Sequence, residues 1–299
     1  MREPLFIGVD GGGSRTRARL RDAAGTKLGE GLAGPGNFRL GLAAFEEVMK
    51  ACRAALAEAG LAEVDAHRVH AGFGLAGAAP EKHRREALGW PHPFGLLDVC
   101  SDAYASWLGA FGGADGAILI AGTGSCGLSF TDGRATEVGG LGSEIGDEGS
   151  GMAIGRTAIR RALWALERYG PMTPLAEAVL ADPRIGHDRE RAVIWANTAR
   201  PRDFADFAPL VFDHAERGDP LGSAIIAEAA SDLTRLARRL LELGPPPIAM
   251  VGSVFDRIRP WIDRDIDAVL VKPPGDAADG AIILARRALE RSGHLAEAG

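Results

Sequence analysis

The chain opens with two apolar, strand-like segments separated by a glycine-rich turn. Residues 5–9 form an apolar run, and after Asp10 and three glycines the chain restarts as the alternating segment TRARL. Alternation with a period of two is typical of a half-buried β-strand. A further strand-like stretch follows a turn near residues 22–26. The pattern therefore predicts three consecutive strands over residues 5–32.

Helical and strand-like segments then take turns along the first half of the chain. Helical spacing covers residues 42–59 and 80–88, and apolar runs typical of buried strands cover 69–75 and 96–100. Another helical segment begins at Asp102. The stretch 31–40, GLAGPGNFRL, is too rich in glycine and proline for regular structure and is expected to be a loop.

A second glycine-rich turn follows the apolar run of residues 117–121. Its glycines, Gly122, Gly124 and Gly127, satisfy the dinucleotide pattern GxGxxG. That pattern requires a helix to begin at the glycines, whereas here the turn Asp132-Gly133 separates two β-prone segments. We therefore expect a hairpin rather than a Rossmann site. Two such strand–turn–strand units predict a duplicated architecture with a ligand held between its halves.

Backbone this poor in side chains can approach a phosphate group closely. Asp10 stands at the end of the first strand, where a carboxylate suits a hydrated Mg²⁺ on a nucleoside triphosphate. A tight hairpin would also explain the three glycines. For Asp102, a helix-capping or first-turn role competes with chemistry, which α/β proteins place at strand ends beside phosphate loops.

The second half is mostly helical over residues 150–243, with a strand at 248–252 and a last helix from Asp276 to about Ser292. A length of 299 residues exceeds one ordinary core. We predict a first domain over residues 1–114 and a second over 115–275, divided near the GGADG segment. The helix of about 276–299 is expected to pack back on the first domain.

Composition narrows the range of partners. The net charge is −6 and no basic run interleaves with aromatic residues, which disfavours nucleic acid. We find neither a signal-peptide pattern nor an apolar run of membrane-spanning length, so a cytoplasmic protein without a membrane partner is expected. The three cysteines, Cys52, Cys100 and Cys126, are scattered and form no CxxC motif.

The two glycine loops resemble the paired phosphate motifs of actin-like sugar kinases and ATPases. The likeness extends through SDAYASW at Ser101, GGLGSEIGDEGSG at Gly139 and VGSVF at Val251. It is greatest for the bacterial N-acetylglucosamine kinase family and its glucosamine kinase branch. This resemblance implies an α/β fold of two actin-like (ribonuclease H-like) domains with a nucleotide and sugar cleft between them.

The resemblance also implies roles for individual residues. Asp102 would be the general base that accepts the proton of the sugar hydroxyl, and Asp10 would hold Mg²⁺. Residues implied to bind ATP are Asp10, Gly11, Gly12, Gly13, Ser14, Thr16, Gly122, Thr123, Gly124, Ser125, Gly252 and Ser253. Those implied to bind the sugar are Asn37, Asp102, Gly140, Leu141 and Asp147, although many relatives carry an aromatic residue where Leu141 stands.

The expected function is phosphorylation of the 6-hydroxyl of N-acetylglucosamine, glucosamine or both, with ATP and Mg²⁺, by a homodimeric enzyme. Two alternatives remain at this point. An energy-coupling ATPase of the dehydratase-activator type would use a shared iron–sulfur cluster, which the scattered cysteines disfavour. A non-catalytic sugar-sensing regulator would need an added DNA-binding segment, for which residues 1–4 leave no room.

Overall fold

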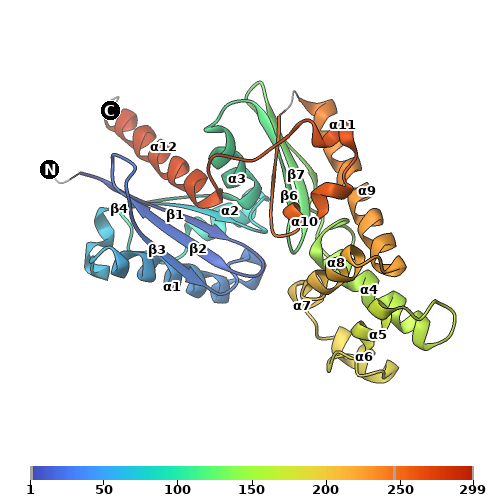
Figure 1. The fold of residues 1–299 in the computed structure, drawn as a ribbon. Coiled ribbons are helices and arrows are strands. Elements are labelled where there is room, and N and C mark those ends of the chain that lie inside the picture. Colours follow the sequence, from blue (N-terminus) through green and yellow to red (C-terminus); the bar gives the residue numbers. More distant parts are fainter. Residues whose placement is uncertain (1–2, 245–246, 298–299) are drawn as a thin grey trace. The chain divides into compact units, whose positions relative to one another are not determined.

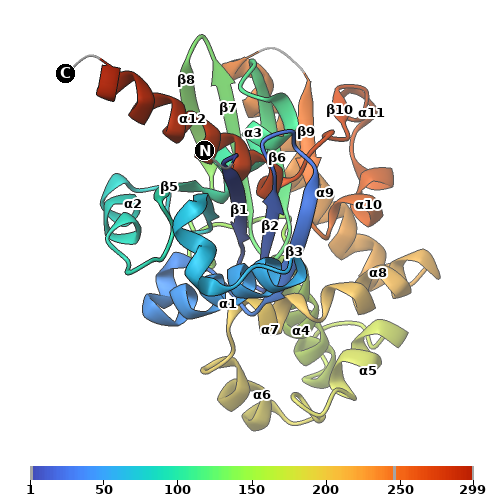
Figure 2. The same ribbon diagram turned by 90° about the vertical axis from the view of Figure 1, so that its left-hand side faces the viewer.

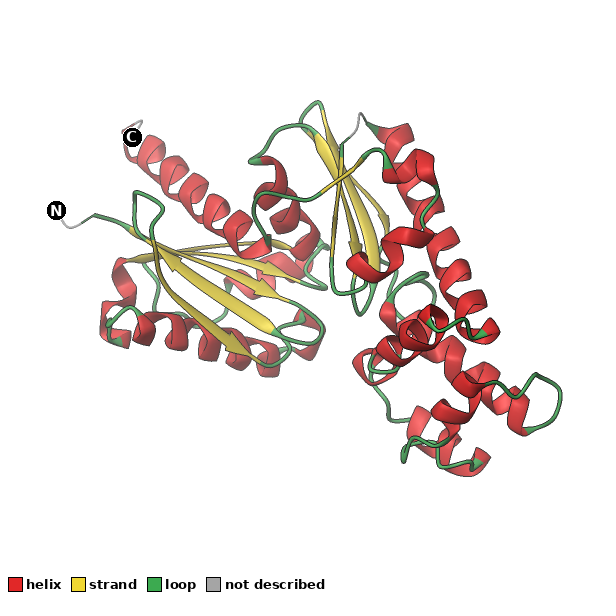
Figure 3. Cartoon of the chain, viewed as in Figure 1, coloured by secondary structure: helices red, strands yellow, loops and turns green. Residues whose placement is uncertain are grey.

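A computed structural model describes residues 3–244 and 247–297 of the chain. The chain divides into two compact units, here called unit 1 (Met1–Ile118 with Pro273–Gly299) and unit 2 (Leu119–Lys272). Each unit contains a five-stranded sheet, and helices pack against it (Figure 1, Figure 3). In the described part of the chain, no helix is long and apolar enough to cross a membrane.

The sheet of unit 1 combines an antiparallel meander with two parallel strands. Strands β1 (Leu5–Gly11), β2 (Thr16–Arg21) and β3 (Lys27–Ala33) form the meander. Strands β4 (Val69–Leu75) and β5 (Leu96–Ser101) join parallel to β1, in the order β3-β2-β1-β4-β5. The strands expected from the alternation and from the apolar runs are confirmed. The loop expected over 31–40 is shorter than predicted, because β3 runs to Ala33 and a 3-10 turn covers Phe38–Leu40.

Helices cover both faces of this sheet. Helix α1 (Leu42–Glu58) packs on β3 and β2, and α12 (Ala277–Glu297) packs on β1 and β4 from the opposite face (Figure 1, Figure 2). Helix α3 (Asp102–Phe111) follows β5 and packs along α12, and α2 (Glu81–Leu88) lies against β5. Further 3-10 turns in the chain cover Glu63–Arg68 and Arg259–Trp261.

Glycines allow α12 to lie directly on the strand backbone. Gly8 on β1 and Gly72 on β4 are partners in register beneath the helix. A Cβ atom at Gly8 would lie 2.1 Å from the carbonyl oxygen of Ala278, and one at Gly72 would lie 2.0 Å from that of Ala281. Any larger residue at either position would push the helix off the sheet.

Unit 2 has the sheet order β10-β9-β6-β7-β8. Its strands are β6 (Gly116–Ala121), β7 (Ser125–Thr131), β8 (Arg134–Gly139), β9 (Ile248–Val251) and β10 (Leu270–Val271). The expected hairpin is confirmed: β7 and β8 pair antiparallel across Asp132-Gly133, whose φ angles of 51° and 75° suit a tight turn. A strand therefore stands where a dinucleotide site would need a helix.

The longest helix of unit 2 is α9 (Pro220–Leu243), against which α4, α5, α8 and α11 pack. Its residues Ile226, Leu233 and Leu240 recur every seven positions and are fully buried, forming an apolar stripe. The others are α4 (Gly151–Leu166), α5 (Pro174–Leu180), α6 (Arg189–Ala196), α7 (Pro201–Ala205), α8 (Ala208–Glu216), α10 (Phe255–Ile258) and α11 (Arg264–Asp267).

Candidate active site

The first glycine loop, Gly11–Arg15, joins β1 to β2 in unit 1. The Gly12 amide closes its turn by donating to the carbonyl of Arg15 at 3.0 Å. Amides from neighbouring segments donate to the carbonyls of Gly11 and Gly12 at 2.8 and 3.0 Å, which ties the loop down. A Cβ atom at Gly13 would meet no atom of the described residues within 4 Å. The loop is thus anchored at its base and open at Gly13.

Asp10 lies just before this loop, with its carboxyl in a partly buried position. Burial raises the pKa of the Asp10 carboxyl above its ordinary value, and the nearby carboxylate of Asp276 raises it further. The guanidinium groups of Arg17, Arg15 and Arg19 act in the opposite direction. A carboxylate whose charge is disfavoured in this way gains from a bound cation.

A magnesium ion fits this environment only with help from other ligands. Within residues 3–244 and 247–297, no group of three or more His, Cys, Asp and Glu side chains could hold a metal ion. Mg²⁺ in nucleotide enzymes is commonly held by one or two carboxylates together with substrate phosphates and water. A single carboxylate at Asp10, beside an open glycine loop, is compatible with that mode.

Three arginines on β2, Arg17, Arg19 and Arg21, form a ladder that begins opposite Asp10 and that sequence reasoning missed. Arg17 donates a hydrogen bond to Asp276 at 2.7 Å, and Arg19 donates two hydrogen bonds to the same carboxylate, at 2.8 and 2.9 Å. Arg21 donates to Asp279 at 2.8 Å. Both carboxylates lie at the start of α12, where Asp276 also accepts the Asp279 amide at 3.1 Å as a helix cap. The ladder holds the start of α12 beside Asp10.

The strand register brings the predicted catalytic residue to the same sheet edge as the first glycine loop. Gly11, Leu75 and Ser101 are partners across β1, β4 and β5, at the carboxyl ends of three parallel strands. Asp102 follows Ser101 directly as the first residue of α3. This edge of a parallel sheet is where α/β proteins bind ligands. The structure therefore brings Asp10 and Asp102 to one edge of unit 1.

Asp102 is not the cap of α3. The Ser101 side chain accepts the Tyr104 amide at 3.2 Å and fills that role. Asp102 stands in the first turn, and its Oδ1 atom accepts the amide of Ala103 at 3.0 Å. The capping explanation that competed with a catalytic one is thus removed, although a first-turn electrostatic contribution remains.

Asn37 lies at the same sheet edge. Its Oδ1 atom accepts the amide of Arg39 at 3.0 Å, and the amide of Phe38 donates to Ala76 at 2.8 Å, just after β4. A Cβ atom at Gly77 would come within 2.8 Å of that Asn37 oxygen. Asn37, one of the residues predicted to bind the sugar, therefore lies over the turn that follows β4.

Thr16, one of the residues predicted to bind ATP, has its side chain hydrogen-bonded within unit 1. Thr16 is fully buried, and its hydroxyl donates to the Gly34 carbonyl at 2.8 Å. Any contact from Thr16 to a nucleotide would therefore come from its backbone. Ser14 lies within the loop and is half-buried.

The second glycine loop, Gly122–Ser125, joins β6 to β7 in unit 2. The first amides of α4, from Gly151 and Met152, donate to the carbonyls of Gly122 at 2.8 Å and Thr123 at 3.2 Å. The Gly122 amide itself donates to Gly124 at 3.0 Å. A Cβ atom at Gly122 would find nothing among the described residues within 4 Å. Like the first loop, this one is tied at its base and open on one side.

Gly252, which is predicted to border the adenosine, lies against the backbone where β6 ends and the second glycine loop begins. Gly252 has a φ angle of 114°, and a Cβ atom there would lie 2.3 Å from the carbonyl oxygen of Ala121. The amide of Val254 donates to that same carbonyl at 3.0 Å. Only glycine fits at position 252, and Ser253 beside it is exposed.

The loop over residues 139–149 folds back onto Ser125. Ser125 is 6% exposed, and its hydroxyl donates to the Glu148 carbonyl at 2.7 Å instead of facing solvent. The Gly140 amide donates to the Ser125 carbonyl at 3.2 Å. The Asp147 carboxylate accepts the Ser125 amide at 3.1 Å. Leu141, in contrast, is 60% exposed.

The cysteines differ in accessibility. Cys52 and Cys100 are buried, and burial raises the pKa of both thiols. Cys126 is partly exposed and is the second residue of β7, one position beyond the second glycine loop. A Cβ atom at Gly140 would lie 3.1 Å from the Cβ atom of Cys126.

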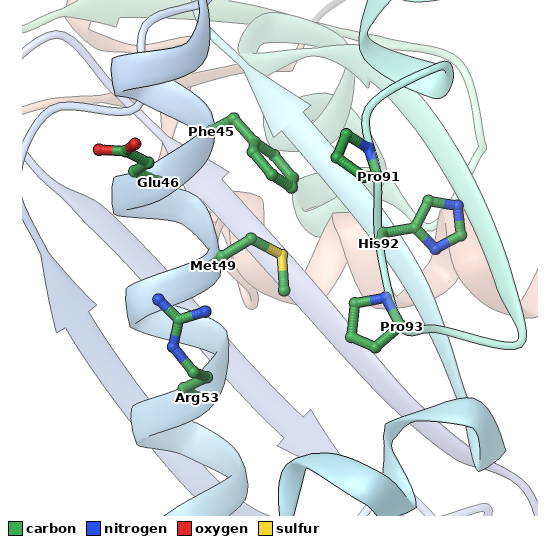
Figure 4. A pocket seen from close by; sticks show the side chains of 7 residues that line it. All are labelled: Phe45, Glu46, Met49, Arg53, Pro91, His92 and Pro93. Atoms are coloured by element: carbon green, nitrogen blue, oxygen red, sulfur yellow. The ribbon is translucent and has the colours of Figure 1, made fainter.

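A cavity of about 430 Å³ lies elsewhere in unit 1, between α1 and the segment 91–93 (Figure 4). Phe45 and Met49 point from α1 toward Pro91 and Pro93, while His92 points away from them. The lining consists of Phe45, Glu46, Met49, Arg53, Pro91, His92 and Pro93. These are not residues that the sequence predicted for a site.

Comparison with known proteins assigns the family. Residues 7–285 match the model of the BadF/BadG/BcrA/BcrD ATPase family, and the chain belongs to this family. It is 37% identical over 281 residues to the glucosamine kinase GspK of Vibrio cholerae, covering 94% of this chain and 95% of that one. The resemblance inferred from the two glycine loops is confirmed.

Solved structures support the same grouping. A candidate N-acetylglucosamine kinase of Chromobacterium violaceum superposes with a TM-score of 0.88 at 35% identity, over 95% of this chain and 99% of that one. A ROK family glucokinase of Streptomyces griseus, at 21% identity and a TM-score of 0.59, covers 96% and 99% and shares the fold. The expected α/β class with two actin-like units is confirmed.

Proposed function

We propose that this protein is an amino-sugar kinase that transfers the γ-phosphate of ATP to the 6-hydroxyl of glucosamine or N-acetylglucosamine. One observation carries the proposal furthest. The strand register of unit 1 brings an anchored glycine loop with its carboxylate, Asp10, and a second carboxylate, Asp102, to the same edge of a parallel sheet. The names of the relatives, a glucosamine kinase and a candidate N-acetylglucosamine kinase, support the same chemistry.

In this proposal, phosphate oxygens approach the backbone of each glycine loop at its open position, Gly13 in the first loop and Gly122 in the second. Asp10 holds the hydrated Mg²⁺, which supplies neutralisation of phosphate charge when bound. Gly252 and Ser253 border the adenosine. Phosphoryl transfer depends on positioning and charge stabilisation more than on a strong base, so the chain needs few reactive groups.

Asp102 would orient the 6-hydroxyl and accept its proton as the hydroxyl attacks the γ-phosphate. Asn37, Gly140, Leu141 and Asp147 would contact the sugar. The exposed side chain of Leu141 offers an apolar surface, where an acetyl methyl could rest, but no ring on which a sugar face could stack. Both sugars are therefore expected to be accepted.

We propose further that the enzyme acts in the cytoplasm as a homodimer. Sedimentation equilibrium of the purified chain tests the dimer, and a mass of one chain at micromolar concentration would contradict it.

The competing functions in this fold make different predictions for ATP consumption. An amino-sugar kinase releases ADP only when a hexosamine is present, whereas a partner-driven ATPase ignores the sugar and a sensor consumes no ATP. ADP release should be measured with glucosamine, N-acetylglucosamine, glucose or no sugar. Release that rises at least about a hundredfold with an amino sugar supports the proposal, and release unaffected by every sugar refutes it.

A further inference from the structure

The 139–149 loop makes unusually complete contact with one residue of the second glycine loop. All three hydrogen-bonding groups of Ser125 meet it: the amide donates to Asp147, the hydroxyl donates to the Glu148 carbonyl, and the carbonyl accepts from Gly140. Only one of these three bonds, the 3.1 Å bond from the Ser125 amide, uses a side chain of the 139–149 loop. The orientation of the Gly124–Ser125 peptide thus depends on the Asp147 carboxylate.

The Asp147 carboxylate is also packed against the middle of the glycine loop. A Cβ atom at Gly124 would lie 2.8 Å from Asp147 Oδ1 and 3.0 Å from its carboxyl carbon. The carboxylate therefore fills the space that a side chain at position 124 would take. The lack of a side chain at position 124 thus makes room for the Asp147 carboxylate and not only for a ligand.

The backbone of Asp147 is set for this contact. Its φ angle is 64°, in the left-handed region that non-glycine residues seldom adopt and that Asp and Asn tolerate best. The Ser150 amide donates to its carbonyl at 3.2 Å, just before α4 begins. Uncommon backbone conformations of this kind persist where the surrounding structure enforces them, often at functional sites.

We infer that Asp147 is a positioning residue for the nucleotide: it fixes the second glycine loop in its binding conformation, whether or not a sugar is present. This role goes beyond the sugar contact proposed for Asp147 and rests on the proposed ATP-binding function of that loop. The carboxylate carries a negative charge close to backbone that would face phosphates, so its charge opposes nucleotide binding while its hydrogen bond favours it.

Two substitutions separate these effects. Asp147→Asn keeps an oxygen acceptor and tolerates the left-handed backbone, but removes the charge. Asp147→Gly also accepts that backbone, but removes the acceptor. Asp132→Gly is the matched control, because Asp132 is also an aspartate with positive φ, 51°, and lies in the β7–β8 turn.

The measurement is the dissociation constant of the magnesium complex of AMPPNP, a non-hydrolysable ATP analogue, without sugar, by titration calorimetry. We expect Asp147→Gly to bind about tenfold more weakly or worse, from the loss of a charge-assisted hydrogen bond. Asp147→Asn should bind as well as the parent or more tightly, and Asp132→Gly like the parent. A residue that only contacts the sugar would leave all four constants equal, and that result overturns the inference while the kinase assignment stands.

Other outcomes are also decisive. A parent chain that does not bind MgAMPPNP refutes the proposed nucleotide function itself, and the inference with it. If Asp147→Gly fails to fold, Gly124→Ala takes its place, because its Cβ atom must displace the carboxylate from the loop. Weakened nucleotide binding in that variant, with a thermal midpoint near the parent's, supports the positioning role. Parent-like binding of Gly124→Ala and equal weakening in Asp147→Asn and Asp147→Gly are each incompatible with it.

Discussion

Replacing Asp102 by asparagine should nearly abolish phosphate transfer while leaving the fold intact. Asparagine keeps the size of the side chain and an oxygen that can accept the Ala103 amide, as Asp102 does at 3.0 Å. It cannot accept the proton of a sugar hydroxyl as a carboxylate can. Because Ser101 provides the cap of α3, the helix retains its start in this variant.

The two expected magnitudes are far apart. The substitution removes a negative charge from the first turn of a helix, a contribution of about 0.3 to 1 kcal/mol to stability. Loss of general-base catalysis typically costs about a hundred- to ten-thousandfold in rate, or roughly 3 to 5 kcal/mol in the activation free energy. Ser101→Ala is the opposite control, since loss of a serine cap costs about 1 kcal/mol of stability and removes no proton acceptor.

The assay is steady-state turnover with glucosamine at saturating MgATP, alongside thermal unfolding of each variant. Asp102→Asn should show a nearly unchanged unfolding midpoint and a turnover number at least about a hundredfold below the parent's. Ser101→Ala should unfold at a lower temperature and keep turnover within about threefold, since a cap acts on stability. If Asp102→Asn retained turnover within a few-fold of the parent, or if the two variants lost activity equally, Asp102 would not be the base.

Three further outcomes are expected. Because the pKa of Asp10 is raised, its carboxyl takes up a proton at a higher pH than usual, so the Mg²⁺ concentration for half-maximal activity should rise on acidification. Asp10→Asn should weaken the dependence of activity on Mg²⁺ and remove this trend. An unchanged Mg²⁺ titration in that variant would make Asp10 only structural. Cys126 is the partly exposed thiol, so alkylation should occur there and should be slowed by MgATP, while Cys126→Ser stays active. Equal labelling with and without saturating nucleotide would contradict the proximity of Cys126 to the nucleotide site. Glucosamine should have a higher kcat/KM than N-acetylglucosamine, because the exposed Glu144 and Glu148 on the 139–149 loop favour a cationic amine. A large preference for the acetylated sugar would overturn this choice and leave the kinase assignment intact.

Local signals predicted much of the fold. The strands of unit 1 follow from alternation and from short apolar runs, and the β7–β8 hairpin follows from Asp132-Gly133, because these signals act over a few residues. The position of Asp102 at a strand end was also predictable, since the strand and the helix beside it each have a clear pattern.

Contacts between distant segments were not predictable in this way. The ladder of Arg17 and Arg19 pairs with Asp276, whose position in the sequence is more than two hundred residues away, and the RTRAR alternation alone names no partner. The hydroxyls of Thr16 and Ser125 are bound to backbone carbonyls of other loops, which no spacing reveals. The hydrogen bond from the Ser125 amide to Asp147 depends on the left-handed backbone conformation of Asp147, which its surroundings impose.

The most direct test of the kinase assignment is identification of the product by phosphorus NMR. The protein should be incubated with MgATP and glucosamine, and separately with N-acetylglucosamine, and the signals of ADP, inorganic phosphate and sugar phosphate integrated over time. We predict one equivalent of sugar 6-phosphate for each ADP formed, with inorganic phosphate at the level of a protein-free control. ADP accompanied by an equal amount of inorganic phosphate, with no phosphate ester on the sugar, would contradict the assignment and identify the chain as an ATPase.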